Sequence, residues 1–516
     1  MADDNLTALR RRKIAALAAL GLPVYNVDFR PDHTMDQALR ELEACEMGPA
    51  AAGDAAEGPA VAVAGRLMLL RLQGKSCFCH LEDETGRLQV WFRLDRLGDT
   101  LFEAVKLLDL GDIVGVAGIL MRTRRGEPTV LATSLRPLVK ALRPPPEKYH
   151  GLQDQETRYR RRYYDLMSSV AQRRHFAARS EVIRSVRRTL EGRGFLEVET
   201  PILQPVPGGG HAVPFRTHWN ALHTEVFLRI AIELHLKRLL VGGYNRVYEI
   251  GRVFRNEGLS PRHNPEFTML EAYQAYADYT DMRHLTEAIV VDAATQLGAQ
   301  AGGGEEGGAA STDPLRRSYG GRAVNLTPPF PAKRMVDLIA EHCGFDPVRA
   351  WDDGTLVEQA HGLGVDLQPA MPLGTVLNEV YEQKVERLLF DPTFVLDYPA
   401  DVSPLARRRS DDPRFVERFE LVIAGRELAN AFSELNDPVD QRARFEEQAR
   451  RRDAGDAEAH PLDEDFLEAI EAGMPPAGGL GVGIDRLVML LTDSSTIRDV
   501  LLFPTMRPVA DGEADA

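Results

Sequence analysis

The chain has 516 residues, of which 44% are hydrophobic and 27% charged, and its formal net charge is −15 at pH 7. Its length predicts two or three globular domains, and its composition is that of a soluble globular protein. The sequence has no apolar run of about eighteen residues, so we expect no membrane-spanning helix. Its four scattered cysteines exclude a disulfide framework and favour a reducing, cytoplasmic location.

Residues 1–60 are predicted to form a helical extension followed by a loop. The basic run at 10–13 and the apolar residues behind it are similar to the start of a signal peptide. Against that interpretation, Asp3 and Asp4 precede the basic run, and no convincing cleavage site follows it. Leucines at helical spacing favour an amphipathic helix that ends near Gly21, and the small residues of 51–60 favour a loop.

Residues 61–143 are predicted to form a small β-barrel. Five short alternating runs are separated by turns that contain glycine, and we expect no long helix between them. This pattern is typical of an OB-type barrel, which binds single-stranded nucleic acid by stacking bases on aromatic side chains. Phe78 and Gln89 lie on adjacent predicted strands and Glu127 lies in a later turn, where they would face such a ligand. From periodicity alone, Phe78 is predicted to pack in the barrel core instead.

Basic residues gather where the barrel meets the rest of the chain. Between Ala117 and Arg162 there are eleven Lys and Arg residues against four Asp and Glu residues, although the whole chain is acidic. This local excess favours a partner held through its phosphates. A proline run that ends at Pro146 marks the domain boundary. We expect a second domain over 147–510, with a flexible Gly- and Ala-rich insertion near 297–321.

A predicted hairpin between 248 and 273 concentrates polar and aromatic side chains. Because side chains alternate along a strand, Arg255 and Glu257 share one face of its first strand. The matching face of the second strand carries Phe267, Met269, Glu271 and Tyr273, and the loop between the strands adds Arg262 and His263. A guanidinium binds a phosphate or carboxylate bidentately, and Phe267 could stack on a flat ring. The alternative is an ordinary hairpin with one solvated face.

A second predicted hairpin turns at Ala424-Gly425. This register pairs Val422 with Glu427, so Glu420 and Glu427 share a face at a diagonal distance of roughly 7–8 Å. Two carboxylates so placed suit Mg²⁺, although two exposed acids on a hairpin would give the same pattern. Three later side chains would lie on the opposite face of a regular strand from Glu427, namely Asn430, Phe432 and Glu434. A bulge is therefore needed if all of them line one site with Glu427.

Together with a Gly-rich run at 478–483 that precedes Arg486, these stretches resemble a known family. The string Phe254-Arg255-Asn256-Glu257, with Arg262-His263-Asn264-Pro265-Glu266-Phe267, resembles motif 2 of the class II aminoacyl-tRNA synthetases, in the version of the lysyl-tRNA synthetases. The Gly-rich run resembles motif 3, and the segment 173–201 resembles motif 1. The stretch from Gly74 to Gln89 resembles the anticodon-binding domain of the same family.

The resemblance implies an α+β multidomain fold, with an N-terminal OB-type β-barrel and a class II catalytic domain built on an antiparallel sheet with flanking helices. It implies a lysine–tRNA ligase that uses ATP with two or three Mg²⁺ ions, charges tRNA(Lys) and forms a homodimer through motif 1. The implied ATP contacts are Arg255, Glu257, Arg262, His263, Asn264, Phe267, Gly483 and Arg486, of which Arg255, Arg262 and Arg486 act in catalysis. The implied lysine contacts are Gly209, Glu233, Arg255, Glu271, Tyr273, Asn430, Phe432 and Glu434. The implied metal ligands are Glu420 and Glu427, and the implied anticodon contacts are Phe78, Gln89 and Glu127.

The sequence departs from the family pattern beside the expected lysine pocket. It has Gly210-His211-Ala212-Val213 where the family has small residues and an arginine, and Ile232 where the family has proline. An aspartate- or asparagine-specific synthetase is one alternative, but it would need a cation where this chain offers Glu271 and Glu434. A non-catalytic RNA-binding paralogue would have lost motif residues, and none is lost. A ligase that attaches lysine to a protein normally lacks the barrel.

Overall fold

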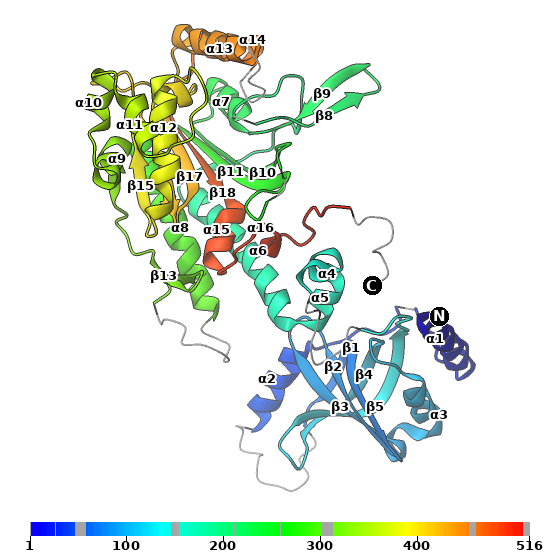
Figure 1. Ribbon diagram of the computed structural model, residues 1–516. Helices are drawn as coiled ribbons and strands as arrows, with labels where there is room; N and C mark the ends of the chain where they lie inside the picture. Colours follow the sequence, from blue (N-terminus) through cyan, green and yellow to red (C-terminus); the bar gives the residue numbers. More distant parts are fainter. Residues whose placement is uncertain are drawn as a thin grey trace. The chain divides into compact units, whose positions relative to one another are not determined.

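The computed structural model describes residues 2–25, 27–46, 58–145, 152, 154–210, 212–258, 260–301, 313–453 and 461–508. The chain divides into two compact units, residues 1–174 and 175–516, whose elements are labelled in Figure 1. Most of the predicted loop at 51–60 lies outside the described residues, as does His211.

The first unit is built on a closed five-stranded barrel with the strand order β1-β2-β3-β5-β4. Its strands are β1 (Ala60–Gln73), β2 (Ser76–Glu82), β3 (Arg87–Arg93), β4 (Ile113–Arg122) and β5 (Pro128–Val139). Along β2, Cys77, Cys79 and Leu81 are buried in the core, while Phe78 and His80 lie half-buried on the outer face. This alternation confirms the predicted OB-type barrel.

The expectation of no long helix in this barrel was wrong. Helix α3 (Leu94–Leu107) follows β3 directly and buries Leu97, Phe102 and Val105 in the barrel core. Gly98 interrupts it with a φ of +75°, and this break obscures the helical period in the sequence. The other helices of the unit are α1 (Ala2–Ala19), α2 (Met35–Glu46), α4 (Gln155–Arg160) and α5 (Arg162–Ser168). Helix α6 (Val170–Glu191) begins in this unit and continues into the second.

The second unit is organised around an eight-stranded sheet with the order β14-β15-β16-β17-β18-β11-β10-β6. Its strands are β6 (Leu196–Glu197), β10 (Arg246–Phe254), β11 (Glu266–Ala275), β14 (Ala332–Arg334), β15 (Thr393–Leu396), β16 (Arg418–Ile423), β17 (Arg426–Ser433) and β18 (Ala477–Gly483). The six central strands pair antiparallel, as predicted, whereas β6 and β14 join the two edges in parallel.

Apolar packing leaves one face of the central strands for the site. Helices α6, α8 (Tyr279–Ala301) and α15 (Ile484–Leu491) share a core with this sheet. Leu270 and Ala272 of β11 point into that core, so Met269, Glu271 and Tyr273, which have the opposite parity, face the other side. The sheet therefore buries one face in packing and presents the other to a cavity.

The remaining elements lie around this framework. They are α7 (Glu233–Val241), α9 (Met335–Cys343), α10 (Pro347–Asp352), α11 (Leu356–Gly362), α12 (Leu373–Lys384), η1 (Glu386–Leu388), η2 (Ala400–Val402), α13 (Pro438–Asp453), α14 (Glu464–Glu471) and α16 (Ile497–Val500). Two small sheets add β7 (Leu203–Gln204) with β9 (Thr224–Leu228) and β8 (Arg216–Trp219), and β12 (Arg316–Tyr319) with β13 (Arg322–Asn325). Helices α9 to α12 form a group beside β15, and α13 and α14 lie next to each other (Figure 1).

Two further expectations from the sequence concern the insertion near 297–321 and membrane-spanning helices. The predicted insertion near 297–321 begins in the last turn of α8 and ends at the β12–β13 hairpin, and residues 302–312 lie outside the described part. Among the helices of the described ranges, none is long and apolar enough to cross a membrane.

Candidate active site

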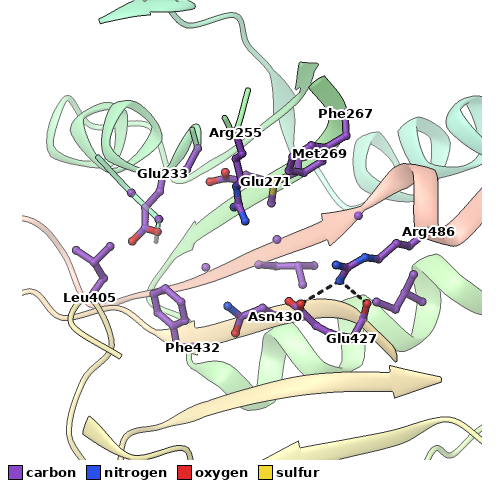
Figure 2. Close-up of a pocket in the computed structure, with 18 of the residues that line it drawn as sticks. Glu233, Arg255, Phe267, Met269, Glu271, Leu405, Glu427, Asn430, Phe432 and Arg486 are labelled. Atoms are coloured by element: carbon purple, nitrogen blue, oxygen red, sulfur yellow. Dashed lines mark hydrogen bonds and ion pairs between the residues drawn. The ribbon is translucent and has the colours of Figure 1, made fainter. Parts of the chain in front are cut away.

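A cavity of about 340 Å³ opens on the free face of the central strands. Its walls come from the β10–β11 hairpin, β17, β18, the start of α7 and the segment 402–406. Figure 2 shows Glu233 and Leu405 at one end of the cavity and Phe267 and Arg486 at the other, with Arg255 between them. Every predicted site residue of this unit lines the cavity except Glu420 and Glu434.

The β10–β11 hairpin supplies one wall. Its register sets Val253 opposite Phe267, and the backbone N–H of Arg255 donates to the carbonyl of Pro265 at 2.9 Å. This pairing extends the hairpin by one residue and aims the Arg255 side chain into the cavity (Figure 2). The Arg255 guanidinium lies 5.3 Å from the centre of the Phe267 ring, a cation–π contact. The cation between the two ends of the cavity therefore contacts the aromatic ring at one of them.

The loop between the two strands is held by Ser260. Its hydroxyl accepts hydrogen bonds from the backbone N–H groups of Arg262 and His263, each at 3.1 Å, and lies 3.0 Å from Nδ1 of His263. Burial lowers the pKa of His263, and the charge of Arg486 adds to this effect, so both disfavour the imidazolium form. The loop thus presents the Arg262 cation and the His263 ring to the Phe267 end of the cavity.

The predicted turn and register of the β16–β17 hairpin are confirmed. Ala424 and Gly425 both have positive φ, 54° and 67°, as a two-residue hairpin turn requires, and Val422 pairs with Glu427. The predicted bulge is confirmed as well, because the register shifts there and Leu421 pairs with Ala429. The shift turns the side chains of Glu427, Asn430 and Phe432 toward one cavity, although their spacing in the sequence has mixed parity.

The two predicted metal ligands each contact an arginine. Nη1 of Arg486 lies 3.0 Å from Glu427 Oε2 and donates to the Glu427 carbonyl at 2.7 Å, and Nη2 of Arg418 donates to Glu420 Oε1 at 2.6 Å. Burial, with the charge of Glu427 beside it, raises the pKa of Glu420 to about 8. Burial alone would raise the pKa of Glu427 too, but the nearby arginines, above all Arg486, outweigh it and the net shift is downward.

This donor set fits a hard cation. Two neighbouring carboxylates repel each other, and a divalent ion between them would relieve that repulsion. Within the described ranges, no group of three or more acidic, histidine or cysteine side chains is placed to hold a metal. An ion held at Glu420 and Glu427 would therefore take its other ligands from phosphate oxygens and water, as Mg²⁺ commonly does.

Buried acids form the opposite end of the cavity. Gly209 has a φ of +83°, and a Cβ there would come within 3.2 Å of the Glu233 Cβ, so the backbone approaches that acid closely. Glu271 accepts hydrogen bonds from the Ile232 backbone N–H at 2.8 Å and from the Tyr273 hydroxyl at 3.1 Å. Burial and the charge of Glu233 raise the pKa of Glu271 to about 7. Ile232 supplies a donor here that a proline could not supply.

Glu434 lies behind this wall. Its carboxylate is fully buried and forms an ion pair with Lys237, which also lies 2.6 Å from Glu233. Burial raises the pKa of Glu434, and Lys237 pulls against that shift. Gly479 of β18 lies against the Glu434 carboxylate and the Tyr273 ring, so a Cβ at this position would overlap both. The glycine in a central strand thus allows the close approach of these two side chains.

Comparisons with known proteins cover both units. The family described as "tRNA synthetases class II (D, K and N)" matches residues 154–507, and the family described as "OB-fold nucleic acid binding domain" matches residues 61–138. A lysine–tRNA ligase of Moorella thermoacetica is 50% identical over 509 residues, which cover 98% of this chain and 99% of that protein. The lysine–tRNA ligase of Bacillus subtilis is 48% identical over 512 residues (98% and 97%), and that of Oceanobacillus iheyensis 53% over 447 (87% and 88%).

The chain belongs to the lysyl-tRNA synthetases of class II. In this synthetase, the outer face of the barrel carries the three predicted anticodon residues. Phe78 of β2 pairs directly with Trp91 of β3, with ring centres 5.0 Å apart and planes at 15°. His80 Nε2 lies 3.1 Å from a carboxylate oxygen of Glu127 and 3.5 Å from the Gln89 amide nitrogen, so His80 links these two residues.

Sequence reasoning missed several residues of the synthetase's cavity. The cavity is also lined by Ser403, Leu405, Arg418 and Asp485, and Lys237 lies directly behind it. Lys237 carried a detectable signal, because it follows Glu233 by four residues at the start of a predicted helix, the spacing of an ion pair. Leu405 and Ser403 carried none, since they come from an irregular segment that only the tertiary fold brings to the site. In the barrel, the sequence pattern predicted Trp91 and His80 only as strand residues and gave no indication that they lie beside Phe78, Gln89 and Glu127.

Proposed function

We propose that the cavity activates L-lysine with ATP, forming lysyl-adenylate and pyrophosphate, and then transfers lysine to the 3′ end of tRNA(Lys). The observation that carries this proposal is the separation of acidic and basic side chains between the two ends of one cavity. Buried carboxylates occupy one end, arginines and Phe267 the other, and Arg255 lies between them. An amino acid with two ammonium groups suits the acid end, and a nucleotide suits the arginine and aromatic end.

The proposed roles follow the order of residues along the cavity. Gly209, Glu233 and Glu271 bind the ammonium groups together with Tyr273 and Glu434, and Asn430 and Phe432 line the space between them. Arg255 contacts both the lysine carboxylate and the α-phosphate of ATP. Phe267 and Arg486 enclose adenine, with Glu257, Arg262, His263, Asn264 and Gly483 around the rest of the nucleotide.

The chemistry needs no nucleophile from the protein. An oxygen of the lysine carboxylate attacks the α-phosphorus, a new P–O bond forms, and the bond to pyrophosphate breaks with its electron pair leaving on pyrophosphate. The protein positions the two reactants and neutralises the phosphate charge with Arg255, Arg262 and Arg486. Glu420 and Glu427 would hold Mg²⁺, two or three ions with the nucleotide, which supplies further neutralisation of phosphate charge.

The barrel is proposed to recognise the anticodon of tRNA(Lys). Phe78 would stack on a base, while Gln89 and Glu127 would bind base edges by hydrogen bonds. Support comes from the position of Phe78 outside the barrel core and from its neighbours on the same face.

Two further proposals concern the enzyme as a whole. Leu196 in the motif 1 segment and Ile202 and Leu203 directly after it are exposed, and we propose that a second copy covers them in a homodimer. The four cysteines are free thiols, which supports a cytoplasmic enzyme.

The full reaction tests the proposed function. Purified protein, ATP, Mg²⁺ and labelled lysine should charge a tRNA(Lys) transcript, and they should leave a transcript with a changed anticodon largely uncharged. Charging of neither transcript with lysine would contradict the proposal. Aspartate and asparagine should not be attached to tRNA, because Lys237 at the acid end is already paired with Glu233 and Glu434, and the acids there would repel the carboxylate of aspartate.

A further inference from the structure

An ammonium group of the protein lies directly behind the acid end of the cavity. Lys237 Nζ lies 2.6 Å from Glu233 Oε1, forms an ion pair with Glu434 Oε2, and lies 5.6 Å from the centre of the Phe432 ring. Its side chain is 0% exposed. Two acids proposed to bind the ammonium groups of the substrate therefore share one internal ammonium group.

We propose that Lys237 is a positioning residue for lysine, which holds Glu233 and Glu434 in place and reduces the charge that the three carboxylates of the acid end present to the substrate. When Glu233, Glu271 and Glu434 are all ionised, the Lys237 ammonium leaves two negative charges, and the two ammonium groups of free lysine match them. This inference rests on the proposed function, since it names a determinant of the same site.

The physical reason is the cost of burying like charges together. Buried carboxylates this close take up protons rather than all remain ionised. The groups that face this cluster are Glu233 and Lys237 from α7, Glu271 and Tyr273 from β11, Glu434 at the end of β17, Arg418 from β16, and Arg255, which follows β10 and acts on Glu271. Arg418 already pairs with Glu420, so Lys237 is the cation bonded directly to the cluster. Without it, the acids would hold more protons, and lysine could bind only after those protons leave.

Burial and neighbouring charges agree with this role. Burial would lower the pKa of Lys237, but Glu233 and Glu434 outweigh it and hold that pKa above its ordinary value, so the ammonium stays charged. A purely structural ion pair would affect only folding. A positioning residue would also change how lysine binding depends on pH and on the charge of the substrate side chain.

The test is Lys237→Met, which keeps an unbranched side chain one heavy atom shorter than lysine and removes its charge. Lysine-dependent pyrophosphate exchange is measured from pH 6 to 8.5 with lysine and with norleucine, which has a neutral side chain of similar length. We expect the lysine KM at pH 7 to rise tenfold or more while the ATP KM stays within twofold. In the wild type, kcat/KM for lysine should fall as the pH is lowered and the acids take up protons. In the variant, the midpoint of this fall should lie at least one pH unit higher. The preference for lysine over norleucine at pH 7 should decrease.

The barrel offers a matched control. The side chain of Lys140 is also 0% exposed and lies between two carboxylates, 2.6 Å from Asp109 and 2.7 Å from Asp112. Lys140→Met should lower the melting temperature and leave the lysine KM and its pH dependence unchanged. The double variant Lys237→Met/Glu434→Gln removes both members of the cavity pair, so its lysine KM should be high without the new pH dependence.

The outcomes separate this inference from the proposed function. Wild-type protein that fails to exchange pyrophosphate with lysine contradicts the function itself. A wild-type enzyme that works, with a Lys237→Met variant whose lysine KM and pH profile match it, overturns only the role of Lys237. Two folding outcomes also overturn the inference, because they show that Lys237 serves folding. In the first, Lys237→Met fails to fold while the double variant folds with normal lysine kinetics. In the second, both of these variants fail to fold while Lys140→Met folds.

Discussion

Replacing Phe78 by alanine separates the two half-reactions of the proposed ligase. Phe78 lies half-buried on the outer face of the barrel, directly opposite Trp91 in the strand register. Stacking of a base on an aromatic side chain contributes roughly 1–3 kcal/mol, so its loss should lower kcat/KM for tRNA charging by about ten- to a hundredfold. Lysine-dependent pyrophosphate exchange should keep its rate, because no anticodon takes part in that step.

The structure also sets the cost of this substitution to folding. Phe78 contributes an aromatic pair with Trp91, worth about 0.5–1.5 kcal/mol beyond burial, but it is not part of the barrel core. Phe92, one residue after Trp91, is 0% exposed in that core, and its truncation should cost about 3–5 kcal/mol. Phe92→Ala is therefore the control for a destabilised barrel. If Phe78→Ala melts as early as Phe92→Ala, or if both half-reactions fall together, Phe78 is a packing residue and the anticodon assignment of this face is wrong.

Four further predictions concern the cavity. Glu434→Gln should raise the lysine KM about ten- to a hundredfold, since it removes a charge-assisted partner, and leave the ATP KM nearly unchanged; unaltered lysine kinetics would remove Glu434 from the site. Glu427→Ala should abolish adenylate formation in a protein that melts like the parent, and activity within tenfold of the parent would contradict its role. Because burial and Glu233 raise the pKa of Glu271 to about 7, this acid gains its charge as pH rises, so the lysine KM should fall between pH 6 and 8, and Glu271→Gln should lose that dependence. Ile232→Pro removes the backbone N–H that donates to Glu271, a hydrogen bond worth about 1.5 kcal/mol or roughly one pKa unit. The pH at the midpoint of the change in lysine KM should therefore rise by about one unit. An unshifted profile would show that the hydrogen bond has no effect on the acid.

The alternation of side chains and the turn residues in the sequence were enough to predict which side chains of the two hairpins share a face. Alternation placed Phe267 and Glu271 on one face of β11, and turn chemistry at Ala424-Gly425 fixed the β16–β17 register. Parity alone also indicated the bulge after Glu427, because no regular strand would present Glu427 and Asn430 to the same cavity. The helix α3 was missed because Gly98 breaks its period within an otherwise β-rich stretch.

Tertiary contacts that no local pattern encodes account for the rest of the site. Glu434 was assigned to lysine from the family resemblance alone, and its pairing with Lys237 depends on how α7 packs against the end of β17. Arg486 contacts Glu427 through the order of strands in the sheet, which brings β17 beside β18. The donor at Ile232 was recorded only as a departure from the family, and its partner Glu271 became visible once the backbone was folded around it.

The central claim, that this cavity activates lysine, is tested most directly by ATP–pyrophosphate exchange with each of the twenty amino acids in turn. Exchange should depend on lysine, with all other amino acids at background or far below it, because the proposed acid end suits two ammonium groups, and its own cation, Lys237, is already paired with Glu233 and Glu434. Exchange driven by aspartate or asparagine, or by no amino acid at all, would contradict this account.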